Sequence, residues 1–325
     1  MAKKVLITGV TGFIGNNLAE KLIEKGYNVY GVIKYVVARD LKKIDRISKN
    51  LTPVTCDITD KHAVKNMLST VLPDYVIHLA AMSPVRLSFR HPFEFQQANY
   101  LGTLNIAHSM MDLPDAESRR LVVASTAEIY GIRPENKPYK EEMALKPSSP
   151  YSVSKAAMDM YIRMMMNSFG LNATIMRCVN TYGRKYDKGF FIEYVINEML
   201  QRKKVYIGAP DSIRDYMYVD DHVNAYIMAM ENKDAKGEAF NVSTGKGVTN
   251  GEAAKMIADI MGFDKNKLVL GSYPPGYPHR PLASDQPYLV LDSSKIRNLL
   301  GWRPTVTLEQ GLEKTINHWS KITKR

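Results

Sequence analysis

The chain has 325 residues, enough for one extended α/β unit with a smaller appended lobe. Apolar residues make up 45% of it and charged residues 24%, and these ordinary globular proportions exclude a disordered chain. The formal net charge of +11 allows a phosphate-rich partner, but the basic residues are dispersed, so we expect a small polyphosphate and no nucleic acid.

Apolar runs such as residues 76–81 fall short of the ~18 residues that a membrane span needs, and the first residues show no signal-peptide pattern. We therefore expect a cytoplasmic protein with no membrane partner. The two cysteines, Cys56 and Cys178, lie in or beside apolar strand-like runs, which indicates buried thiols rather than a disulfide. The seven histidines show no paired spacing, so we expect no metal site.

The first elements along the chain are predicted to be a strand, a glycine-rich turn and a helix. Lys4–Thr8 is a short apolar strand, Gly9–Gly15 forms the turn, and Asn16–Lys25 is an amphipathic helix that ends at Gly26. This order is the context in which glycines bind a dinucleotide rather than simply making a turn.

Each glycine of the turn has a separate use in such a site. Gly9 permits the sharp turn, Gly12 lets the backbone approach a pyrophosphate, and Gly15 lets helix and strand pack closely. The helix N-terminus then offers free N–H groups to the anion. Phe13 and Ile14 belong to the same turn and are expected to contact the cofactor.

The second predicted strand, Asn28–Ile33, ends at Lys34, where an NAD site usually places an acidic residue on the ribose 2′-hydroxyl. Lys34 and Arg39 would either neutralise the 2′-phosphate of NADP or be solvated loop residues. Lys34 and Arg39 alone are therefore compatible with both NAD and NADP.

Further along, a strand ends at Ser125 and Thr126, and a turn-rich segment then leads into a long helical pattern rich in methionine. Tyr151 and Lys155 lie four residues apart near the start of this helix, on one face of it. A phenol with a pKa of ~10 is a poor base at neutral pH. A neighbouring ammonium such as Lys155 and a positive nicotinamide ring are needed to lower that pKa.

The GxxGxxG turn and the Tyr-x-x-x-Lys pair resemble the extended short-chain dehydrogenase/reductase family, and the resemblance covers nearly the whole chain. It implies an α/β fold with a Rossmann-type doubly wound parallel sheet over residues 1–178, which would bind the cofactor and carry the catalytic helix. Residues 179–325 would form mainly a smaller α/β lobe that binds a nucleotide sugar, with some segments returning to the first domain. The resemblance also implies a homodimer and favours NAD, with NADP still possible.

Further cofactor contacts are implied by the family's order of landmarks. They are Asp57 and Ile58, which would face the adenine; Leu79, Ala80 and Ala81, along the cofactor; and Asn99, in the following helix.

The resemblance also assigns the catalytic residues. Thr126 would hydrogen-bond the reacting sugar oxygen, and Tyr151 would remove its proton while hydride leaves the same carbon for the nicotinamide. Lys155 would complete the triad and hold the ribose, and Ser125 would contribute to substrate binding.

Substrate contacts are implied in the C-terminal half. Asn180 would reach the substrate pyrophosphate or cap a local turn, and Phe190 would lie near the sugar or in the core. The remaining positions are Val205 and Tyr206, on a strand along which the family binds the base, and Arg214 and Arg280, whose planar guanidinium groups suit a phosphate clamp.

Two reactions at C4 of the sugar fit this set of residues. A 4-epimerase needs only Tyr151 and the cofactor, whereas a 4,6-dehydratase needs a second base for the C5 proton. Glu128 occupies the position that supplies this base in dehydratases, but Ala127 replaces an aspartate that some of them use.

The glycine turn and the segment 214–221 look more like epimerases, and residues 29–47 look somewhat like GDP-mannose dehydratases. We predict a 4-epimerase of a UDP-hexose or UDP-N-acetylhexosamine. The alternatives are a 4,6-dehydratase of the GDP-mannose or dTDP-glucose type and, as a non-enzyme, a dinucleotide-sensing regulator.

Overall fold

The computed structural model describes all residues except 1, 35–43, 45–46, 277–280, 282–284 and 324–325. Its centre is a seven-stranded sheet in the order β11-β6-β5-β4-β1-β2-β3, and every neighbouring pair in it is parallel. The strands are β1 (Lys4–Thr8), β2 (Asn28–Ile33), β3 (Leu51–Thr55), β4 (Tyr75–His78), β5 (Arg120–Thr126), β6 (Ala173–Cys178) and β11 (Ala239–Val242). The predicted doubly wound Rossmann-type sheet is therefore confirmed.

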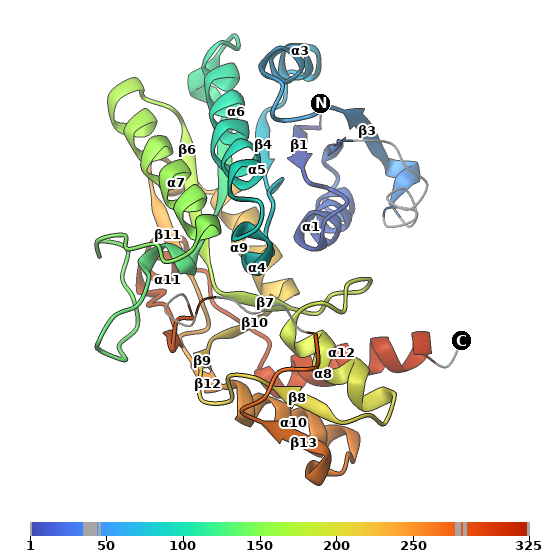
Figure 1. Ribbon diagram of the computed structural model, residues 1–325. Coiled ribbons are helices and arrows are strands. Elements are labelled where there is room, and N and C mark those ends of the chain that lie inside the picture. The colour runs from blue at the N-terminus through green and yellow to red at the C-terminus, as the bar shows by residue number, and fades with distance from the viewer. Residues whose placement is uncertain (1, 35–43, 45–46, 277–280, 282–284, 324–325) are drawn as a thin grey trace.

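Helices cover both faces of this sheet (Figure 1). Val5 and Ile7 of β1 pack into a cluster with α1 (Phe13–Glu24) and α9 (Val219–Glu231), while Leu6 points into a second cluster. That second cluster contains side chains of α3 (Lys61–Val71), α6 (Gly102–Met111) and α7 (Pro150–Phe169). Because successive strand residues face opposite sides, a strand buried on both faces needs consecutive apolar residues, which β1 has at residues 5–7.

Capping fixes the start of helix α7. Ser149 is the N-cap and forms a capping box with Ser152, and Pro150 occupies the first helical position. The helix ends at Gly170, whose φ of 71° is in the left-handed region that favours glycine. These local signals explain why the sequence located this helix to within about one residue.

The prediction for α1 was wrong by three residues, because the helix begins at Phe13 rather than Asn16. Glycine has low helix propensity, so the pattern suggested that the helix starts after Gly15. The structure instead uses Gly12 as the N-cap and places Gly15 inside the first turn.

The C-terminal lobe has small sheets and its own apolar core, and it lies below the central sheet in Figure 1. Its strand pairs are β7 (Asn180–Tyr182) with β10 (Tyr216–Tyr218), β8 (Val205–Ile207) with β13 (Leu268–Leu270), and β9 (Ile213–Arg214) with both β12 (Val248–Thr249) and β14 (Tyr288–Leu289). Its helices are α8 (Phe191–Leu200), α10 (Asn250–Met261) and α12 (Leu308–Thr323), whereas α11 (Ser294–Leu300) packs against β11.

Short helical segments connect the larger elements. They are α4 (Val85–Ser88), α5 (Pro92–Phe95), the π-helix η2 (Gln96–Leu101), and the 3-10 turns η1 (Ser48–Asn50), η3 (Ala116–Ser118), η4 (Ala127–Tyr130), η5 (Lys233–Ala235) and η6 (Lys265–Lys267). Within the described part of the chain, no helix has the length and apolar character required to cross a membrane.

Candidate active site

The strand order reverses beside β1, which pairs with β2 on one side and β4 on the other. In open parallel sheets a ligand crevice forms at the carboxyl ends of the strands at such a point. A cavity of about 430 Å³ lies there, at the ends of β1, β4, β5 and β6. Most of the predicted site residues line it together: Gly9, Gly12, Phe13, Ile14, Gly15, Leu79, Ala81, Ser125, Thr126, Glu128, Tyr151, Lys155, Asn180 and Phe190.

The glycine turn forms one end of this cavity and fits a dinucleotide. A Cβ on Gly9 would lie 2.9 Å from the Cα of Ala80, and one on Gly15 would lie 2.3 Å from the carbonyl oxygen of Gly9. Gly12 is the N-cap of α1 and has no side chain that could accept hydrogen bonds from the first N–H groups of the helix. The first N–H groups of a helix have no partner within it, so this end of α1 suits a diphosphate.

The segment after β4 is held by buried polar side chains. Thr8 Oγ1 accepts hydrogen bonds from the backbone N–H groups of Leu79 and Ala80, both at 3.1 Å. The side-chain amide of Asn99 accepts from the Met82 N–H (2.7 Å) and donates to the Met82 carbonyl (2.9 Å). Asn99 is fully buried, so the structure places it behind the cavity wall, where it positions the segment that the cofactor would contact.

Tyr151 and Lys155 project from the first turns of α7 into the cavity. Burial raises the pKa of Tyr151, against a lowering hydrogen bond with Thr126, and the charge of Glu128 raises it further. Burial also lowers the pKa of Lys155 to about 8, and its ammonium donates to the Ala124 carbonyl at 2.9 Å. Within the protein, burial therefore outweighs the hydrogen bond with Thr126, and the pKa of the phenol lies above its usual value.

Glu128 lies on η4, directly after the strand that carries Thr126. Its backbone N–H donates to Thr126 Oγ1 at 3.3 Å, which fixes the start of this turn. The half-buried carboxylate lines the same cavity as Tyr151. The structure thus brings two groups that can transfer protons, a phenol and a carboxylate, to one cavity.

The hydroxyl of Ser125 forms a hydrogen bond with another side chain of the protein. It donates to Asp159 Oδ2 at 2.8 Å, and the same carboxylate accepts two hydrogen bonds from Arg177, at 2.7 and 2.9 Å. Asp159 and Arg177 are fully buried behind the end of β5. Ser125 therefore touches the cavity while its polar atom holds the strand in place, and Thr126 is the better placed to bind a sugar oxygen.

A second cavity of about 280 Å³ lies towards the C-terminal lobe and shares Asn180 and Phe190 with the first. Tyr206 and Arg214, two of the predicted substrate contacts, line it, and Arg214 pairs with Asp285 at 3.4 Å. Val205 does not line this cavity. Neighbouring strand residues face opposite sides, so Val205 is fully buried in the core of the lobe. Arg280 and Arg39 lie outside the described residues.

The sequence analysis missed several residues that line these cavities. Arg86 of α4 lies over the ring of Tyr273, 5.1 Å from its centroid, at the second cavity. Arg184 and His222 line the first cavity. No motif marked these residues, because each reaches its cavity through tertiary packing. Cys178 also lines the first cavity as a free buried thiol, and burial raises its pKa to about 12.

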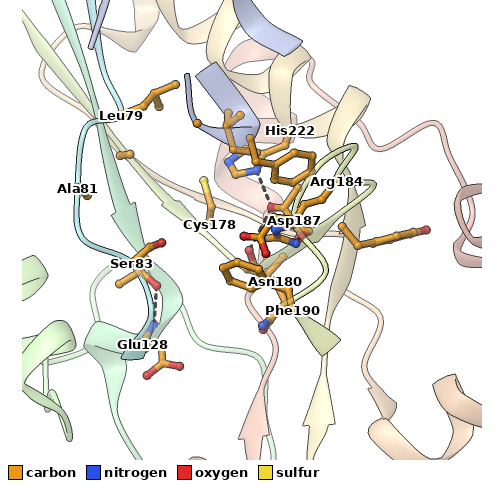
Figure 2. A pocket seen from close by; sticks show the side chains of 18 of the residues that line it. Leu79, Ala81, Ser83, Glu128, Cys178, Asn180, Arg184, Asp187, Phe190 and His222 are labelled. Carbon is orange, nitrogen blue, oxygen red and sulfur yellow. Dashed lines mark hydrogen bonds between the residues drawn. The ribbon is translucent and has the colours of Figure 1, made fainter. Parts of the chain in front are cut away.

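Figure 2 shows Leu79, Ala81 and Ser83 along one side of the first cavity and Asn180, Arg184 and Phe190 along the other. The remaining predicted cofactor contacts lie outside the lining. Lys34 and Asp57 form an exposed ion pair at 2.9 Å, and Ile58 is buried. Partial burial would raise the pKa of Asp57, but hydrogen bonds from Thr59 and Lys34 lower it overall.

Comparison with known proteins supports this arrangement. The sequence model of the family described as GDP-mannose 4,6 dehydratase matches residues 6–315. The dTDP-glucose 4,6-dehydratase 1 of Escherichia coli (strain K12) is 31% identical over 99% of this chain and 94% of that protein.

Solved epimerases share the fold. The UDP-glucose 4-epimerase of Thermotoga maritima, crystallised with UDP-glucose, is 30% identical with a TM-score of 0.86, covering 98% of this chain and 99% of that one. The UDP-glucose 4-epimerase of Thermus thermophilus, in complex with NAD, is 28% identical with a TM-score of 0.83, covering 97% and 98%. The chain therefore belongs to the GDP-mannose 4,6 dehydratase family, a group of nucleotide-sugar epimerases and dehydratases within the extended short-chain dehydrogenases/reductases, as its motifs predicted.

Proposed function

We propose that this chain is an NAD-dependent nucleotide-sugar 4,6-dehydratase. The observation that carries the proposal is the carboxylate of Glu128 in the same cavity as Tyr151. A 4-epimerase has no use for a second base, whereas a dehydratase requires one. The family match and the E. coli relative, which is named as a dehydratase, support the same choice.

The first half of the reaction oxidises C4. NAD supplies the hydride acceptor and donor when it is bound in the glycine-turn end of the cavity. Tyr151 takes the proton of the C4 hydroxyl, while Thr126 hydrogen-bonds that oxygen. Lys155 stabilises the resulting phenolate, because an adjacent ammonium favours the charged form.

The second half eliminates water. The C4 ketone acidifies the C5–H bond, and Glu128 removes that proton. The C6–O bond breaks, and the hydroxyl leaves as water with one of the two protons taken from C4–OH and C5. The bound cofactor would return its hydride to C6 and the other proton would go to C5, which gives a 4-keto-6-deoxy sugar.

The second cavity suits the nucleoside diphosphate part of the substrate. Asn180 lines both cavities, so it lies where the sugar and the nucleotide would join. Arg214 and Arg86 supply positive charge near the aromatic ring of Tyr273. The base of a nucleotide would stack on the ring of Tyr273, and its phosphates would pair with the guanidinium groups of Arg214 and Arg86.

The predicted 4-epimerase stays the second candidate. The Thermotoga relative, named as a UDP-glucose 4-epimerase, matches 98% of this chain, and Ala127 lacks the carboxylate that some dehydratases have at this position. In that reaction Tyr151 and NAD suffice, and hydride returns to the other face of C4.

Proton NMR in D₂O separates the two reactions. We would incubate the purified protein with dTDP-glucose, UDP-glucose, UDP-N-acetylglucosamine and GDP-mannose in turn. A dehydratase gives a C6 methyl signal and solvent deuterium at C5, whereas an epimerase gives the C4 epimer with no deuterium.

Glu128→Gln sharpens the assay, because removing a general base costs on the order of 10²–10⁴ in rate. We expect this variant to lose dehydration while still binding NAD. Formation of a C4 epimer at an undiminished rate in Glu128→Gln would contradict the dehydratase proposal and establish the epimerase. Tyr151→Phe serves as the control that blocks both reactions.

A further inference from the structure

His222 is the one histidine that lines the first cavity among the described residues. It lies in the first turn of α9, the helix that packs against α1 behind the glycine turn. The side chain is buried, with 5% of its surface exposed. No sequence motif gave this histidine a function.

Two contacts fix the orientation of this ring. Nδ1 lies 2.6 Å from the Thr181 hydroxyl, a bond drawn as a dashed line in Figure 2. The ring also stacks on Tyr226, with centroids 5.1 Å apart and planes inclined by 25°. The imidazole therefore cannot turn without breaking both contacts.

The second nitrogen, Nε2, is buried and has no hydrogen-bond partner in the described part of the protein. Burial, with a contribution from Arg184, lowers the pKa of His222 to about 3, so the ring is neutral at pH 7 and carries one proton. The Thr181 hydroxyl lies 2.6 Å from Nδ1 and 3.4 Å from the Val179 carbonyl, so we assign its proton to the shorter contact, which leaves the ring proton on Nε2. A buried donor without an acceptor is costly, so Nε2–H needs a partner from the cavity.

The neighbours of His222 indicate which partner that is. Arg184, whose charge acts on His222, has its guanidinium 4.5 Å from the ring centroid of Phe13, the first residue of α1. This end of the cavity therefore combines the guanidinium of Arg184, which also pairs with Glu193 at 3.4 Å, a helix N-terminus and a neutral N–H donor. All three favour oxygen acceptors carrying negative charge.

We propose that His222 is a cofactor-binding residue, whose Nε2–H donates a hydrogen bond to an oxygen of the ribose-diphosphate part of the dinucleotide. The inference rests on the NAD use in the proposed function, but not on which reaction follows. Thr181 and Tyr226 act as positioning residues for the ring.

Equilibrium binding of NAD to the full-length protein, measured by calorimetry, tests this. His222→Phe keeps a flat ring that can stack on Tyr226 but has no donor, and His222→Gln keeps an N–H donor. Loss of one hydrogen bond predicts a roughly threefold to tenfold weaker Kd for NAD in His222→Phe. His222→Gln should retain most of the affinity, and binding of dTDP or UDP should be unchanged in both.

An NAD affinity for His222→Phe within twofold of wild type would overturn the inference. Equal losses in His222→Phe and His222→Gln would do the same, because they would indicate a purely structural role.

A spectroscopic test needs no substitution in the cavity. In protein labelled with ¹⁵N-histidine, the Nε2–H signal of His222 should be present without cofactor and shift when NAD is added. A signal that does not move on saturation with NAD, or a proton found on Nδ1, counts against the proposal. NAD binding that depends on His222 in a protein that converts no nucleotide sugar would keep this inference and reject the proposed reaction.

Discussion

Tyr151 is the residue on which both candidate reactions depend. It lies in the cavity with Thr126 and Lys155, and burial raises its pKa, so its proton transfer depends on cations placed beside it. We expect Tyr151→Phe to lower turnover by about 10²–10⁴-fold while NAD binding stays within a few-fold of wild type. Turnover measured by NMR and NAD affinity measured by calorimetry check the two halves of this expectation, and a variant with normal turnover would contradict it.

Two buried histidines make folding stability depend on pH. Burial lowers the pKa of His78 and His222 to about 3, while a histidine in an unfolded chain titrates at about 6.5. Between these values the unfolded chain binds protons that the folded chain does not, so stability falls as the pH falls. The slope approaches ~1.4 kcal/mol per pH unit for each histidine.

Urea unfolding between pH 7 and pH 5 measures this slope. Burial raises the pKa of the carboxyls of Glu141, Glu193 and Asp215, which acts in the opposite direction, so the histidine contribution is obtained as the difference between the wild type and a histidine variant. His222→Phe should remove about half of the histidine contribution. A variant whose stability falls with pH as steeply as that of the wild type would refute the assignment.

The predicted site residues that line the first cavity carry local signals in the sequence. Thr126, Tyr151 and Lys155 lie at fixed distances from a strand end or from each other along one helix, so spacing alone brings them to the cavity. Arg86 and His222 reach their cavities from helices whose positions depend on packing of distant segments. Sequence spacing does not predict the packing of distant segments, which is why Arg86 and His222 were missed.

At the scale of elements, the pair of Asp159 and Arg177 joins three parts of the active site. Asp159 lies on α7, Arg177 on β6, and Ser125 of β5 donates to the same carboxylate. Removal of one partner of a buried ion pair leaves an uncompensated charge. We expect Asp159→Ala to lower the free energy of unfolding by about 3–5 kcal/mol.

The double variant Asp159→Leu/Arg177→Met is the matched comparison. It replaces both charges by apolar groups, so we expect most of the stability to return, as urea unfolding would show. A double variant less stable than Asp159→Ala would show that the other hydrogen bonds of Arg177, to Tyr130 and to the Glu141 carbonyl, dominate.

The sequence located the strands well and one helix start poorly. Lys4–Thr8 and Asn28–Ile33 have the predicted bounds, because a parallel strand buried on both faces requires an uninterrupted apolar run. The start of α1 was missed because the dinucleotide turn needs glycines inside the first helical turn, against their propensity. At the start of α1, the requirement for glycines in the turn therefore outweighs their low helix propensity.

At the scale of the molecule, α7 presents an apolar stripe to solvent. Val153, Met160 and Met164 are exposed at spacings of seven and four residues, whereas Met158 and Met165 are buried in the core. We predict that a second copy of the chain covers this stripe and that the protein is a homodimer in solution.

Light scattering after size exclusion tests the dimer. Met160→Glu should give the mass of a monomer, because a charge in an apolar contact must be desolvated. Ile260→Glu is the control, since Ile260 is also exposed but lies on α10 in the other lobe. A dimer that persists in Met160→Glu would place the interface elsewhere.

The outer strand of the central sheet has a consequence for how the protein is made. β11 pairs with β6, although it is synthesised some sixty residues later, after much of the second lobe. Asn241 of β11 accepts a hydrogen bond from Tyr130, the last residue of the turn that carries Glu128. A nascent chain that has emerged only as far as Cys178 already contains the glycine turn and Tyr151, yet its β6 edge is open and its catalytic turn lacks support. We therefore expect the active site to be complete only late in translation, after the ribosome has released β11, the edge strand that pairs with β6.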